Sequence, residues 1–133
     1  MLEEYLTYFT DDANPDVIFI PGETGVMLHD GKKGFKEAIK FLKKQKSLPA
    51  AMVDTKALEN ASLDHANDLA DKKIRGHQGS DGSTFQTRIE KYAKWGGAIF
   101  EAISYGPKTA EKVLVDFIVD VGLPKRSHRA AIF

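Results

Sequence analysis

The chain has 133 residues, with 19 basic residues (Lys plus Arg) and 19 acidic residues (Asp plus Glu), so its formal net charge is zero. That length suits one domain and excludes a second full domain. The 42% content of hydrophobic residues is typical of a folded protein with a core. A net charge of zero provides no summed positive field toward DNA or an acidic membrane, so we expect no nucleic-acid partner.

The chain contains no cysteine, which excludes a disulfide framework and any thiolate metal site. Its apolar stretches are far shorter than the roughly 20 residues that a membrane-spanning helix needs. The start, Met1-Leu-Glu-Glu, lacks the basic residues and apolar run of a signal peptide. We therefore expect no transmembrane segment and no export signal within the sequence given.

Apolar residues recur at helical spacing over residues 2–9, which predicts one or two turns of helix. The apolar residues from Val17 to Ile20 fit either a short strand or a buried extended segment. Residues 34–46 have the pattern of a half-buried helix with solvated lysines. Its apolar face would consist of Phe35, Ala38, Ile39 and Leu42.

Asp54 is a plausible N-cap for a helix that runs to about Lys73. The expected inward face consists of Leu58, Ala61, His65 and Leu69, with Ala66 and Ala70 beside them. A histidine on such a face is more often a hydrogen-bonded core residue than a metal ligand, so we interpret His65 in that way.

The next segment, Gly76 to Ser83, has three glycines in eight positions and is expected to form a tight loop. Ser83 and Gln86 fit a capping box at the start of a helix from Thr84 to about Ala93. That helix would turn Phe85, Ile89 and Tyr92 inward.

Residues 98–104 have the short, aromatic and β-branched composition of a strand, with Ile99, Glu101 and Ile103 on one face. A carboxylate between two isoleucines is costly unless it is paired, so Glu101 should meet a histidine, an arginine or a metal. Pro107 and Thr109 open a last apolar helix that should stop at Gly122 and Pro124.

Four residues could carry chemistry, because imidazole nitrogens and carboxylate oxygens bind divalent ions such as zinc and also relay protons. They are His77, Glu101, Asp120 and His128. Their spacing alone does not define a site, and His77 could instead stabilise its loop. Periodicity also does not choose between Asp116 and Asp120, since both lie near the apolar face of the last helix.

Four strings of the sequence form a recognisable set. They are Leu63-Asp-His-Ala-Asn-Asp-Leu-Ala70, Gly76-His-Gln-Gly-Ser-Asp-Gly-Ser-Thr-Phe-Gln-Thr-Arg-Ile89, Glu101-Ala-Ile-Ser-Tyr-Gly106 and Ser127-His-Arg-Ala-Ala-Ile-Phe133. Together they resemble the CAP superfamily of cysteine-rich secretory, antigen-five and pathogenesis-related proteins, also called sperm-coating-protein-like. The chain is most similar to the disulfide-free branch of bacteria, protists and plants, over about residues 35–133. This resemblance implies an α+β fold, an α-β-α sandwich, in a single domain over residues 1–133.

The resemblance also implies a central cleft, often with a divalent ion, that His77, Glu101, Asp120 and His128 would line as metal ligands. His77 corresponds to the first cavity histidine and His128 to the second, while Glu101 and Asp120 correspond to the two acids. The family's glutamate is an aspartate at position 120, and three neighbouring positions also depart from the family pattern. They are Phe100 and Ser127 in place of glycine and Ala102 in place of asparagine.

The family's last two strands have no counterpart before Phe133, so we expect a mostly helical chain that is either a fragment or has its open sheet edge covered by another chain. The resemblance favours a secreted binding or interaction domain, with a protein partner or a lipid ligand, rather than a standard enzyme. Two alternatives stay open. One is a metal-assisted hydrolase, and the other is a structural subunit of an intracellular assembly.

Overall fold

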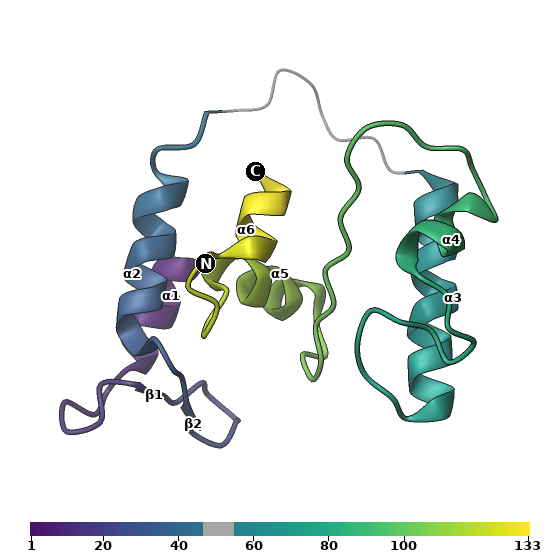
Figure 1. Ribbon diagram of the computed structural model, residues 1–133. Coiled ribbons are helices and arrows are strands. Elements are labelled where there is room, and N and C mark those ends of the chain that lie inside the picture. Colours follow the sequence, from purple (N-terminus) through teal and green to yellow (C-terminus); the bar gives the residue numbers. More distant parts are fainter. Residues whose placement is uncertain (47–54) are drawn as a thin grey trace. The chain divides into compact units, whose positions relative to one another are not determined.

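The computed structural model describes residues 1–46 and 55–133. These residues form two compact units, which are described separately: residues 1–46 with 104–133 make unit 1, and residues 55–103 make unit 2. Helices dominate both (Figure 1), as predicted, and the only strands among the described residues are two short ones. None of the described helices combines the length and the apolar character needed to cross a bilayer.

Unit 1 begins with a short helix that continues as a 3-10 turn, followed by a small antiparallel hairpin and three further helices. Val17 pairs with Met27 in the hairpin, and Ile18 pairs with Val26. The elements are α1 (Leu2–Tyr5), η1 (Leu6–Tyr8), β1 (Val17–Ile18), β2 (Val26–Met27), α2 (Gly31–Leu42), α5 (Ala110–Val119) and α6 (Ser127–Ile132).

The core of unit 1 lies where α1, α2 and α5 meet. Phe35 of α2 is at its centre, with its ring stacked on Tyr5 at 5.6 Å and edge-on to Phe9 at 5.5 Å between centroids. Ala38 of α2 and Val119 of α5 are almost completely buried in the same cluster. The apolar faces predicted for the first two helices therefore do pack together.

Charged side chains then tie α6 to the helices of unit 1. Arg129 is buried and donates to the carbonyls of Ile118 and Val119, at 2.5 and 3.1 Å, and to Glu37 of α2 at 2.9 Å. Those carbonyls end α5 and would otherwise lack partners, so Arg129 caps that helix. Arg126, the residue before α6, also forms ion pairs with Asp30 and Glu37.

Unit 2 consists of α3 (Lys56–Lys72), the glycine-rich loop, α4 (Phe85–Glu90) and an irregular segment up to residue 103. The two helices lie side by side (Figure 1). Ala61, His65 and Leu69 of α3 are buried, as predicted. Leu58, predicted to face inward, is 47% exposed, because the six residues of α4 cannot cover all of a 17-residue helix.

The predicted helix boundaries need small corrections. Asp54 lies outside the described residues, and the cap at the start of α3 is Thr55, whose hydroxyl accepts from Leu58 N–H at 3.4 Å. The capping box is one residue later than predicted, at Thr84 and Thr87. Ser83 instead belongs to the loop, where its N–H donates to Asp81 at 2.9 Å.

The strand predicted over residues 98–104 is wrong, since this segment is irregular in the structure. A strand needs a neighbouring strand to satisfy its N–H and C=O groups, and the described residues offer it no such neighbour. Two other helix bounds differ from the prediction. Helix α2 starts at Gly31 rather than at residue 34, and α5 ends at Val119 rather than at Gly122. Tyr92, predicted to face inward, is 41% exposed.

Acid should weaken unit 1 through Asp30, whose carboxylate accepts from Arg126 at 2.5 Å and from Gly122 N–H at 3.0 Å. The hydrogen bond from Arg126 contributes most to lowering the pKa of Asp30 from 3.8 to about 2. A lowered folded-state pKa stabilises the fold when the acid is ionised, so this contribution is complete well above pH 3.8 and is lost as the pH falls toward 2. Arg126 and Arg129 likewise lower the pKa of Glu37.

Asp30→Asn should therefore reduce the free energy of unfolding at pH 7 by about 1 kcal/mol, a modest value for a partly exposed ionic hydrogen bond. In this variant the free energy of unfolding should also decrease less between pH 4 and pH 2 than it does in the original chain. Urea unfolding at several pH values measures both effects. Asp12→Asn is the control, because Asp12 is exposed and has no ion pair among the described residues. Equal pH dependence in the two variants would contradict the role of Asp30.

Candidate functional site

His77 and Glu101 form the first of two histidine–carboxylate pairs. His77 Nδ1 lies 2.8 Å from Glu101 Oε1, within unit 2. Arg88 of α4 holds the other carboxylate oxygen, at 2.5 Å from Oε2, and its side chain is only 4% exposed. The expectation that Glu101 meets a histidine, an arginine or a metal is therefore confirmed, because it meets the first two together.

Arg88 also fixes the loop that carries His77. Its guanidinium donates to the carbonyls of His77 and Ser83, each at 3.2 Å. The loop is further closed by Gly79 N–H donating to Ser83 C=O, at 2.9 Å. One buried cation thus connects the backbone of the histidine with the carboxylate that faces its ring.

Asp120 and His128 form the second pair, in unit 1. Asp120 is buried, and its Oδ1 lies 2.7 Å from His128 Nδ1 while its Oδ2 accepts from the backbone N–H of His128 at 2.9 Å. The ring of His128 packs near that of Phe117, with centroids 5.3 Å apart. The same carboxylate therefore orients the imidazole and caps the start of α6.

The backbone at Asp120 explains how its side chain reaches α6. This residue follows α5 in the left-handed conformation, with φ 57° and ψ 50°, which ends the helix. Asp116, the alternative left open by periodicity, is engaged elsewhere and accepts from the Ser104 hydroxyl at 3.2 Å. Geometry therefore selects Asp120 as the partner of a histidine.

Both histidines use the same ring nitrogen toward their acid. An ionised carboxylate can only accept, so Nδ1 carries the proton in each pair and the neutral ring has its lone pair on Nε2. This is the arrangement by which a carboxylate orients a metal-binding histidine in many proteins. In this arrangement the carboxylates position the imidazole rings.

The structure pairs the four predicted residues two by two, with one pair in each unit. Within either unit, no three His, Asp or Glu side chains of the described residues come close enough together to hold a metal ion. The metal site predicted from His77, Glu101, Asp120 and His128 therefore stays a prediction, while the two pairings are features of the structure.

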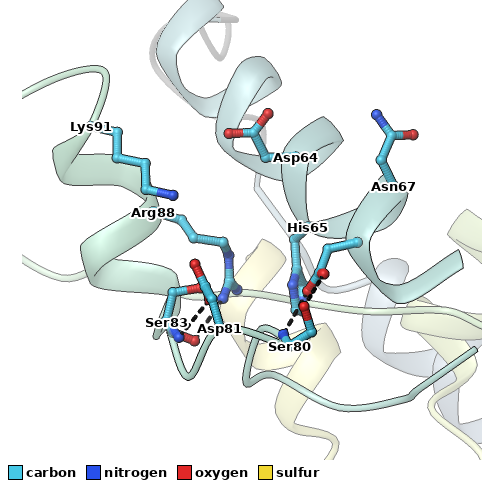
Figure 2. Close-up of a pocket in the computed structure, with 9 residues that line it drawn as sticks. Asp64, His65, Asn67, Ser80, Asp81, Ser83, Arg88 and Lys91 are labelled. Carbon is cyan, nitrogen blue, oxygen red and sulfur yellow. Dashed lines mark hydrogen bonds between the residues drawn. The ribbon is translucent and has the colours of Figure 1, made fainter. Parts of the chain in front are cut away.

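Unit 2 also contains a cavity of about 300 Å³ (Figure 2), which is lined in part by Arg88, the residue that binds Glu101. Its wall is formed by α3, the glycine-rich loop, α4 and the residue that follows α4. The lining residues are Asp64, His65, Asn67, Asp68, Ser80, Asp81, Ser83, Arg88 and Lys91.

The carboxylates of this cavity are engaged by neighbouring groups. Asp68 accepts from the backbone N–H and the hydroxyl of Ser80, at 2.7 and 2.5 Å, and these bonds lower the pKa of Asp68. Asp64 accepts from the Tyr92 hydroxyl, which raises the pKa of Tyr92. These bonds hold the loop against α3, and they account for the acidic wall without a ligand.

His65 is a buried core histidine, as predicted. Its Nε2 donates to Gly76 C=O at 2.9 Å, which anchors the start of the glycine-rich loop to α3. Its Nδ1 is the only buried side-chain nitrogen or oxygen of the described residues that lacks a hydrogen-bond partner. Since Nε2 carries the proton, Nδ1 is an acceptor in the neutral ring.

Sequence reasoning missed two functional contributors, Arg88 and Asp68. The sequence did contain one signal for Arg88. It lies on the short helix that follows the glycine-rich loop, from which a long cationic side chain can reach back to the carbonyls of the loop. Nothing in the pattern distinguishes Asp68 from other acids on α3. No family model, no curated protein and no solved structure matches this chain.

Arg88→Ala should destabilise the fold by about 3 kcal/mol, because it leaves the carboxylate of Glu101 largely buried without its cation. Arg88→Ala combined with Glu101→Ala should lose less than the sum of the single variants, since the two groups interact directly. Urea unfolding measures these values. Lys94→Ala, at an exposed position, is the charge-matched control and should change stability by less than about 0.5 kcal/mol. Additive effects of the two substitutions would contradict the pairing.

Proposed function

We propose that this chain is a CAP-type binding domain in which the His77–Glu101 pair and the Asp120–His128 pair are the candidate ligands of a divalent cation such as Zn²⁺. One observation supports the proposal: each histidine engages a carboxylate through Nδ1, at 2.8 Å for His77 and 2.7 Å for His128. A carboxylate that engages a histidine in this way orients the ring and raises its basicity as a metal ligand. The finer fold, an α-β-α sandwich, and a secreted origin belong to the same proposal.

A closed structural zinc site takes four protein ligands, whereas an ion held by fewer protein donors keeps coordination positions for water or for a further ligand. A binding role, in which the ion helps to recognise a partner, is part of the proposal.

Zinc binding tests the proposal directly. In calorimetric titration of the full chain with Zn²⁺, His77→Ala and His128→Ala should each reduce zinc binding, because each removes the imidazole of one pair. Glu101→Gln and Asp120→Asn should weaken binding by about 10- to 100-fold, since they change only the groups that orient the rings.

His29→Ala is the matched control, because the His29 side chain is 83% exposed and belongs to neither pair. It should bind zinc like the original chain. Circular dichroism of every variant establishes that the fold is retained. No zinc binding by the original chain, or equal losses in all three histidine variants, would refute the proposal. A stable complex with another protein that survives all these substitutions would favour the structural subunit instead.

A further inference from the structure

Helix α2 presents an unusual concentration of positive charge. Seven lysines and one glutamate lie between Gly31 and Lys46, although the whole chain is neutral. At 100° per residue, five of the lysines fall within an arc of about 100° on the helix, a set that we call the lysine face. The lysine face consists of Lys32, Lys33, Lys36, Lys40 and Lys43.

This face points away from the core of unit 1. The residues of α2 that are buried, among them Phe35 and Ala38, lie on the opposite side of the helix. The lysine side chains are exposed, except that Lys32 is partly covered. Such an arrangement keeps all five ammonium groups at one surface, within about one and a half nanometres along the helix.

The positive charge is largely uncompensated. Within the described residues only Lys43 of the lysine face has an ion pair, with Glu3 at 2.7 Å. Glu37, the one acid on α2, is directed to Arg126 and Arg129, at 2.8 and 2.9 Å. An ordinary surface intersperses both signs of charge, so a face of one sign favours a partner of the opposite sign.

We propose that the lysine face docks unit 1 onto a membrane surface that contains anionic lipids. Lysines are flexible point charges that attract lipid phosphates and carboxylates without a fixed geometry. Between Gly31 and Lys46 there is no arginine for bidentate recognition of a phosphate or a base. The lysine face also carries no aromatic ring on which a base could stack, so nucleic acid is the less favoured anionic partner.

Vesicle co-sedimentation of the full chain tests this proposal. The chain should bind vesicles of phosphatidylcholine mixed with phosphatidylserine, bind vesicles of pure phosphatidylcholine weakly, and be released by high salt. The triple variant Lys33→Gln, Lys36→Gln, Lys40→Gln should lose affinity for the anionic vesicles by about a hundredfold.

A second triple variant provides the control, since Lys94→Gln, Lys108→Gln, Lys125→Gln removes the same charge from exposed positions outside α2. It should retain most of the binding. Equal losses in both triple variants, or equal binding to neutral vesicles, would overturn the proposal. Tighter binding to duplex DNA than to anionic vesicles, lost in the α2 variant alone, would assign the lysine face to nucleic acid and overturn the membrane assignment.

Discussion

Each unit depends on one buried arginine. Arg88 and Arg129 have side chains that are only 4% exposed, and each donates to two backbone carbonyls and one carboxylate. A guanidinium is too costly to bury unless its donors are satisfied. Each arginine therefore brings together carbonyls and an acid that the chain would otherwise leave apart. The hydrogen bonds of the guanidinium in this way hold the local fold together.

The two histidine–carboxylate pairs owe their geometry to these arginines. In unit 2, Arg88 contacts the acid of the pair directly and also the backbone of His77. In unit 1, Arg129 binds the carbonyls of Ile118 and Val119, the two residues that precede Asp120, and so holds the end of α5 from which that carboxylate extends. Groups positioned in this way need little reorganisation when a ligand binds, which is the physical basis of a preorganised site.

Short-range patterns in the sequence were enough to predict the helices before residue 120, though not α6, and the identity of His65 as a core residue. They predicted that Glu101 needs a partner, since a carboxylate beside isoleucines must be paired. They could not predict that residues 98–104 lack a strand, because a strand forms only where another segment of backbone, distant in the sequence, lies beside it and pairs with it. The roles of Arg88 and Arg129 were equally hidden, since a guanidinium reaches carbonyls that are 5 to 11 residues away.

Net charge is a poor guide to what a small domain attracts. The total of zero was reason to expect no polyanionic partner, but a total says nothing about how charges are arranged. Here Asp30 and Glu37, the acids nearest to the lysine face in the sequence, form ion pairs with Arg126. They therefore do not neutralise the lysines of α2. Because screening limits electrostatic attraction to about 10 Å at moderate salt, a partner that reaches α2 senses this local face rather than the neutral whole.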